Sequence, residues 1–149
     1  MSVGSTVNSS KLYTPRLLGL AASLYHHPYN AAAPFLGEAR SQTCGSSIKI
    51  SAKCDVEGRI SQVGMVVTAC AIGQASAAIL ADGAAGKSSS DIEATLSSIE
   101  NWLRGEGAPP DWPGFDALYP TLSHHGRHGA LLIPWKGIID ALSSGPIES

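Results

Sequence analysis

The chain has 149 residues, of which 44% are hydrophobic and 15% charged, and its formal net charge is -2. This balance predicts one globular domain and gives no sign of the clustered Lys and Arg of a nucleic-acid surface. No apolar run reaches the roughly 18 residues of a membrane helix. The polar start lacks the pattern of a secretory signal. We therefore expect a disordered tail over 1–10, one domain over 11–149, a cytoplasmic location, and neither nucleic-acid nor membrane partners.

The first predicted helix starts at Thr14 and Pro15, because a hydroxyl N-cap followed by proline is a common helix start. Leucines at helical spacing continue this pattern to about His26. The next segment, 31–43, contains a proline and a glycine and is expected to be irregular.

Alternating apolar and polar residues over 48–54 predict a half-buried strand. A turn over 55–58 follows, and 60–67 reads as one or two further strands with an interruption at Gly64. Because the connections are short, an antiparallel meander is the favoured arrangement.

The pattern becomes helical from Cys70 and ends at Gly83 or Gly86. Ser90 and Glu93 have the spacing of a capping box, which predicts the start of a second helix with an apolar stripe behind it. The stripe runs to about residue 103.

A loop rich in Pro and Gly follows over 105–114, and 118–122 is a short apolar patch whose pattern does not decide between helix, strand and loop. Pro134 starts a final predicted helix that ends at Leu142. A helix, a strand meander and then helices indicate an α+β fold. The aromatic residues of this half are expected in the core or at its rim: Trp112, Tyr119 and Trp135.

Three cysteines, without a signal peptide, favour free thiols or thiolate ligands over a disulfide framework. Cys44 precedes the first predicted strand, and Cys70 stands where backbone N–H groups of a helix start favour a thiolate. Their wide separation suits two loops at the same end of a sheet. A buried, small hydrophobic role remains open for both. It is the favoured role for Cys54, which lies on the inward pattern of its strand.

Several segments resemble the NifU/IscU/SufU-type iron–sulfur cluster assembly scaffold proteins. Residues 43–50, Thr-Cys-Gly-Ser-Ser-Ile-Lys-Ile, are similar to the first cysteine segment of that family, and 57–60 to its strand-turn-strand. Residues 69–78, Ala-Cys-Ala-Ile-Gly-Gln-Ala-Ser-Ala-Ala, resemble its second cysteine segment, which is the most specific part of the match. The resemblance covers 13–142, nearly the whole chain.

This resemblance implies a three-stranded antiparallel sheet packed against four to five helices. It also implies a scaffold rather than an enzyme. In the family, three cysteines and one aspartate hold a zinc ion or a nascent iron–sulfur cluster. The partners that the resemblance implies are a cysteine desulfurase, which delivers the sulfur, and apo iron–sulfur proteins, which accept the cluster. Thiolate ligands suit zinc as well as iron–sulfur clusters.

Carried over residue by residue, Cys44 and Cys70 match the first two cysteines of the family. Ser46 stands at the position of the aspartate and Ala130 at that of the third cysteine. Serine is a poor ligand and alanine cannot ligate. His128, two residues before Ala130, is the candidate replacement, because a neutral imidazole binds both zinc and iron. The remaining histidines are weaker candidates or structural residues: His124, His125, His26 and His27.

Three functions follow from this pattern. The first is a scaffold that binds iron, zinc or a nascent cluster through Cys44 and Cys70, with His128 or a partner thiol completing the site. The second is a degenerate homologue that acts as an interaction protein without metal. The third is a sulfur acceptor that forms a persulfide, and it ranks last because neither cysteine has an evident His or acidic partner.

Overall fold

The computed structural model describes residues 12–42 and 45–145. The expected tail over 1–10 and Cys44 lie outside the described residues. Within them, strands β1 (Phe35–Arg40), β2 (Ser47–Cys54) and β3 (Ile60–Thr68) form one antiparallel sheet in the order β1-β2-β3. The predicted meander and the α+β class are therefore confirmed.

Strand β1 corrects the expectation that 31–43 is irregular. Its pairing with β2 extends from Phe35 opposite Ala52 to Arg40 opposite Ser47. The glycine in this segment, Gly37, faces helix α5 (His128–Ser143) so closely that a Cβ atom there would lie 2.7 Å from the Gly137 carbonyl oxygen. Packing against α5 thus stabilises a strand whose local sequence gives no alternating signal.

Strand β3 is a single strand, so Gly64 does not interrupt it. A Cβ atom at Gly64 would instead clash with the carbonyl oxygen of Pro28. Next to it, the Met65 N–H donates to the His27 carbonyl at 2.9 Å. The glycine therefore allows β3 to lie close to the backbone at His27 and Pro28.

The N-terminal helices follow the sequence pattern. Helix α2 (Pro15–Ala22) begins where predicted, with Thr14 Oγ1 accepting from Leu17 N at 3.1 Å. The chain then tightens into the 3₁₀ helix η1 (Ser23–His26). Helix α3 (Ala71–Gly83) has Cys70 as its N-cap, as the change of periodicity predicted.

Two predicted helix starts are wrong. The capping box of α4 (Ser89–Leu103) is made by Ser88 and Asp91, not by Ser90 and Glu93. Helix α5 begins at His128, well before Pro134, which lies inside it. Pro134 is buried, and the burial of α5 against the sheet offsets the hydrogen bond that a proline removes from a helix.

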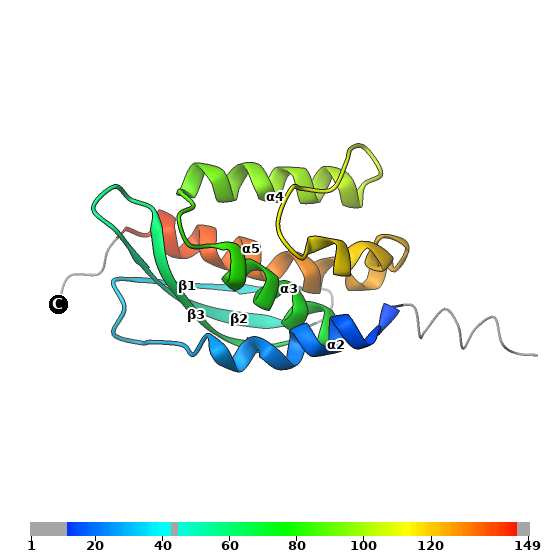
Figure 1. Cartoon of the computed structure of the whole chain (residues 1–149), viewed down its shortest axis with the longest axis horizontal. Coiled ribbons are helices and arrows are strands. Elements are labelled where there is room, and N and C mark those ends of the chain that lie inside the picture. Colours follow the sequence, from blue (N-terminus) through cyan, green and yellow to red (C-terminus); the bar gives the residue numbers. More distant parts are fainter. Residues whose placement is uncertain (1–11, 43–44, 146–149) are drawn as a thin grey trace, which may run out of the picture.

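The helices cover one face of the sheet, as Figure 1 shows. Helix α5 packs on β1 and β2, and α3 packs on β3 and beside α5. Helix α2 lies against α3, while α4 lies along α5. Between α4 and α5 the chain forms the 3₁₀ helices η2 (Phe115–Ser123), which contains the apolar patch, and η3 (His125–Arg127).

The aromatic side chains lie where the sequence placed them. Trp135 and Trp112 are buried and meet edge to face with ring centroids 4.9 Å apart, while Phe115 packs on Trp135 at 6.3 Å. Tyr119 stays exposed at the rim. Edge-to-face pairs stabilise such a core beyond the area they bury.

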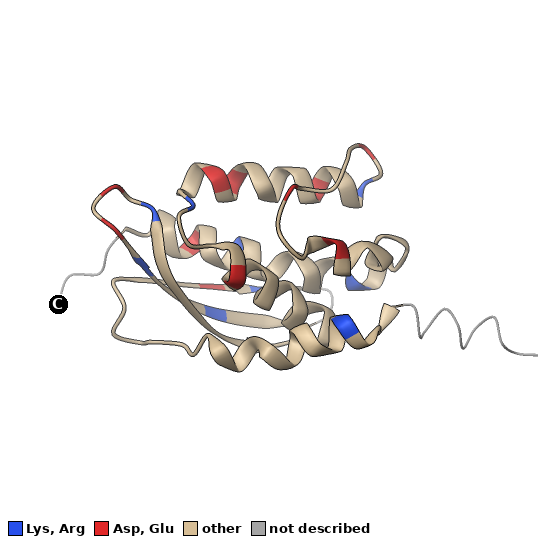
Figure 2. Ribbon diagram, in the orientation of Figure 1, with Lys and Arg blue, Asp and Glu red and all other residues tan. Residues whose placement is uncertain are grey.

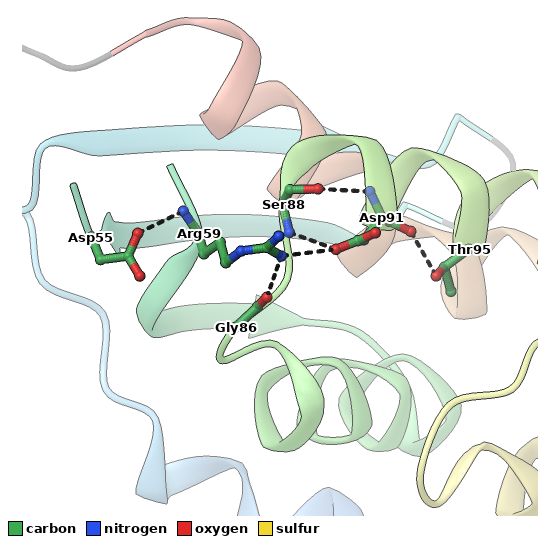
Figure 3. A network of polar contacts seen from close by, with 6 residues as sticks. All are labelled: Asp55, Arg59, Gly86, Ser88, Asp91 and Thr95. Carbon is green, nitrogen blue, oxygen red and sulfur yellow. Dashed lines mark hydrogen bonds and ion pairs between the residues drawn. The ribbon is translucent and has the colours of Figure 1, made fainter. Parts of the chain in front are cut away.

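A polar network ties the turn after β2 to the start of α4 (Figure 3). The Arg59 guanidinium donates to the Gly86 carbonyl at 3.0 Å and lies 3.7 Å from the Asp91 carboxylate. Asp55 Oδ1 accepts from the backbone N–H of Arg59 at 3.0 Å. This network holds the end of the sheet that lies farthest from Cys70.

Candidate functional site

The candidate site is a pocket of about 320 Å³ beside Cys70, hereafter the Cys70 pocket. Three segments far apart in the chain form its wall. They are the approach to β2, the junction of β3 and α3, and the start of α5. The lining residues are Gly45, Ser46, Thr68, Ala69, Cys70, Gly126, Arg127 and Ala130.

Cys70 takes its place from two adjoining elements. It follows the last residue of β3 closely and is the extended N-cap of α3, with φ -68° and ψ 176°. Its side chain is half-buried and makes no capping hydrogen bond. The first backbone N–H groups of α3 therefore have no side-chain cap, and such groups attract negative charge.

Ala130 enters the pocket from α5, and a glycine on α3 brings it close. A Cβ atom at Gly73 would lie 2.6 Å from Ala69 Cβ and 3.3 Å from the Ala130 carbonyl oxygen. Any side chain at Gly73 would therefore collide with Ala69 and crowd the Ala130 carbonyl beside the pocket. Sequence reasoning missed this residue. A glycine in the first turn of a helix, which costs roughly 1 kcal/mol relative to alanine, was the available signal.

Ser46 also lines the pocket and is 5% exposed. Its carbonyl oxygen accepts a hydrogen bond from Ser41 N at 2.8 Å, which joins the end of β1 to the start of β2. Cys44 lies two residues before it and outside the described residues. The pocket thus brings together Ser46, Cys70 and Ala130, the three described positions that the sequence resemblance aligned with ligands.

His128, the first residue of α5, is not among the residues that line the pocket. Its Nε2 atom lies 3.1 Å from the Thr121 carbonyl oxygen and 3.0 Å from that of Leu122. Its ring meets that of His125 with centroids 5.1 Å apart. Because two carbonyl oxygens face Nε2, this nitrogen carries a proton, and Nδ1 is the atom with a lone pair for a metal.

Cys54 and the N-terminal histidine pair lie outside the pocket. Cys54 ends β2 and is half-buried against the core. Burial, and after it the charge of Asp55, raises the pKa of the Cys54 thiol, which disfavours a thiolate there. His27 Nε2 lies 2.8 Å from Asp82 Oδ1, a contact that joins the end of η1 to α3.

The charge around the pocket differs from the charge on α4. Helix α4 carries Asp91, Glu93 and Glu100 and no Lys or Arg, and Figure 2 shows acidic residues gathered along it. No Asp or Glu lines the Cys70 pocket among the described residues, whereas Arg127 does.

Within 12–42 and 45–145, no group of three His, Cys, Asp or Glu side chains is placed to hold a metal ion. No helix of the same ranges could cross a bilayer.

Comparisons with known proteins connect this fold to solved structures. No family model matches the chain, and no curated protein matches it. A nitrogen-fixing NifU-like protein (N-terminal) from Brucella abortus superposes with a TM-score of 0.83 at 22% identity, covering 91% of this chain and 95% of that one. A proposed iron–sulfur cluster assembly scaffold protein for the SUF system from Fervidobacterium islandicum gives 0.74 at 21% identity, covering 90% and 98%. The chain therefore has the fold of the NifU-like N-terminal domain and of the SUF-system scaffold.

Proposed function

We propose that this protein acts in iron–sulfur cluster assembly as a scaffold-like protein, with Cys44 and Cys70 as thiolate ligands. The observation that carries the proposal is the Cys70 pocket itself. Ser46, Cys70 and Ala130 are far apart in sequence, were matched to ligand positions from sequence alone, and line one cavity. A chance resemblance has no reason to place all three around the same space.

The cargo of this site is iron, zinc or a nascent iron–sulfur cluster. Cys70 supplies sulfur at the start of α3, where it is the N-cap residue and its side chain makes no capping hydrogen bond. Because Cys70 is half-buried, a cluster held there would remain within reach of a partner. A site from which cargo is passed on needs such access. The protein then holds and transfers cargo and is not an enzyme.

Partners follow from the same role. A cysteine desulfurase supplies the sulfur, and apo iron–sulfur proteins accept the finished cluster, in the cytoplasm. His128 is the proposed third ligand, through Nδ1, since Nε2 faces the two carbonyl oxygens of η2. A thiol of a partner protein is the alternative third ligand.

The test is anaerobic reconstitution with iron and sulfide, followed by bound-metal analysis and visible absorption. We expect metal in the wild type, its loss in Cys70→Ala and in Cys44→Ala, and its retention in Cys54→Ala. Cys54→Ala is the matched control because that thiol lies at the other end of β2. Ser46→Asp combined with Ala130→Cys should raise the metal content, because it adds a carboxylate and a thiolate to the pocket wall.

A second candidate function is an interaction protein of the same fold that binds no metal. One observation favours it: Cys70 is the sole Cys, His, Asp or Glu among the described residues that line the pocket. A wild type that stays free of metal, while the Ser46→Asp/Ala130→Cys variant binds it, would exclude the first function and favour the second.

A further inference from the structure

The helices cover one face of the sheet, and the opposite face is its outer face. Gly37 points toward α5, since a Cβ atom there would meet the backbone of Gly137 and Ala141. Because successive residues of a strand point to opposite faces, the neighbours of Gly37 in β1 point outward. The strand register then places two rows of three side chains on the outer face: Glu38, Lys49 and Val66 in one row, and Arg40, Ser47 and Thr68 in the other.

The chain itself covers only part of this outer face. Segment 28–34 crosses it from β3 toward β1, with the Pro28 carbonyl oxygen against Gly64 and the Asn30 N–H donating to Ser51 Oγ at 2.9 Å. Gly64 and Ser51 lie opposite each other in the register. The two outward rows lie between this segment and the end of the sheet that leads to Cys70. They line a groove of about 330 Å³, hereafter the outer groove.

The outer groove carries unpaired charge and an exposed apolar side chain. Arg40 and Lys49 are exposed, and neither side chain makes a hydrogen bond or ion pair within the part of the chain that the structure describes. Val66, opposite Lys49, is 52% exposed. Glu38 is the single carboxylate of the two rows and lies on the edge strand β1. Two cations beside an exposed valine favour a ligand with carboxylates and an apolar side chain.

The size of the outer groove favours a segment of a partner protein over a second copy of this chain. Neighbouring strands lie about 4.8 Å apart and each residue adds about 3.3 Å, so the two rows measure roughly 14 Å by 13 Å. This area of about 190 Å² is far below the roughly 800 Å² per partner of a standard interface. A single segment of chain, 28–34, already spans the neighbouring part of the same face.

We infer that the outer groove binds an extended acidic segment of a partner protein that carries one apolar side chain. The carboxylates pair with Lys49 and Arg40, and the apolar side chain lies on Val66. Because Thr68 lines both the outer groove and the Cys70 pocket, the bound segment lies next to Cys70. The contacts involve no metal, so this inference goes beyond the proposed function and does not depend on it.

The test selects heptapeptides from a random phage-displayed library on the whole chain, prepared free of metal. The enriched sequences should contain more Asp and Glu than the starting library, together with an apolar residue. Fluorescein-labelled copies of these peptides are then titrated with the protein, and fluorescence anisotropy gives the Kd. Arg40→Gln and Lys49→Gln should each raise the Kd about two- to fivefold, the range of an exposed ion pair.

Further variants separate the groove from a general effect of charge. Glu38→Gln should lower the Kd by a similar factor, because it removes a carboxylate that repels the peptide. Val66→Thr should raise the Kd, whereas Lys136→Gln, at an exposed position of α5, is the control and should leave it unchanged.

A selection without acidic enrichment would overturn the inference, as would a Kd that Arg40→Gln and Lys49→Gln leave unchanged. A dimer in sedimentation that Lys49→Gln dissociates would also overturn it, because a second copy would then occupy the groove. None of these outcomes bears on metal reconstitution, which tests the proposed function separately.

Discussion

The Trp135 indole Nε1 donates a 2.9 Å hydrogen bond to Ser76 Oγ, which in turn donates to the Leu131 carbonyl at 2.7 Å. Ser76 lies on α3, whereas Trp135 and Leu131 lie on α5, and all three are fully buried. One hydroxyl therefore joins the two helices whose N-terminal ends form the Cys70 pocket.

Ser76→Ala should lower the free energy of unfolding by about 1–3 kcal/mol, because it leaves the buried Trp135 N–H without a partner. Urea unfolding measures this as a lower midpoint at constant slope. Ser144→Ala, which removes an exposed hydroxyl at the end of α5, is the control and should stay within about 0.5 kcal/mol. Equal effects of the two changes would contradict the bridging role of Ser76.

Gly37→Ala should destabilise the protein by about 3 kcal/mol or more, because the new methyl group would meet the backbone of α5 at Gly137 and Ala141. Gly19→Ala is the matched control on the exposed side of α2, where a Cβ atom would have no neighbour within 4 Å. It should stabilise the protein by about 0.5–1 kcal/mol, as expected for alanine in a helix. The melting temperatures of both variants test this. An unchanged melting temperature in Gly37→Ala would show that α5 can shift to make room for the methyl group.

The capping box of α4 gives a prediction about pH. The hydrogen bond from the Ser88 backbone N–H, at 3.0 Å, holds the pKa of Asp91 below its ordinary value, with smaller effects from the Ser88 hydroxyl and Arg59. Because the folded pKa lies below the unfolded one, the carboxylate stabilises the fold fully above the ordinary pKa of about 3.9. This stabilisation is lost as the pH falls through the folded pKa.

Asp91→Asn should therefore unfold at a lower temperature than the wild type near pH 7, and the gap should close as the pH falls below about 4. Asp111→Asn is the control, since Asp111 is exposed and has no hydrogen bond or ion pair to the described residues. A gap that is the same at both pH values would mean that the charge of Asp91 does not stabilise α4.

Helix-start residues and hydrophobic periodicity correctly predicted those helices and strands that depend on neighbouring residues in the sequence. Thr14-Pro15 marked the start of α2, alternation marked β2, and the change of period at Cys70 marked α3. Strand β1 was missed because its stability comes from α5, which lies about a hundred residues away in sequence.

The remaining errors have the same origin. The start of α5 was missed because a buried proline is tolerated when tertiary packing offsets the lost hydrogen bond. The capping box was misplaced because both Ser88-Asp91 and Ser90-Glu93 have the required spacing, and only the geometry of the preceding turn chooses between them.

The candidate site could be predicted as far as its positions. The family resemblance placed Ser46, Cys70 and Ala130, and the structure places them around one pocket. Arg127 and Thr68 also line the pocket, and no local pattern marks either as a lining residue. Their roles depend on how the start of α5 meets the end of β3, which is a property of the whole fold.

His128 combines a structural contact with the proposed role as a ligand, and one variant tests both. His128→Ala should lower the free energy of unfolding by about 1 kcal/mol with or without metal, because Nε2 no longer donates to the Thr121 and Leu122 carbonyls. If Nδ1 also binds the metal, the same variant should weaken metal binding. It should also change the d–d absorption spectrum of the protein loaded with Co²⁺. His125→Ala, which removes the ring that meets His128 edge to face, should leave the spectrum unchanged. Since His128 does not line the pocket, ligation requires the start of α5 to shift toward Cys70 when metal binds. An unchanged spectrum in His128→Ala would assign this residue to the turn between η2 and α5 alone.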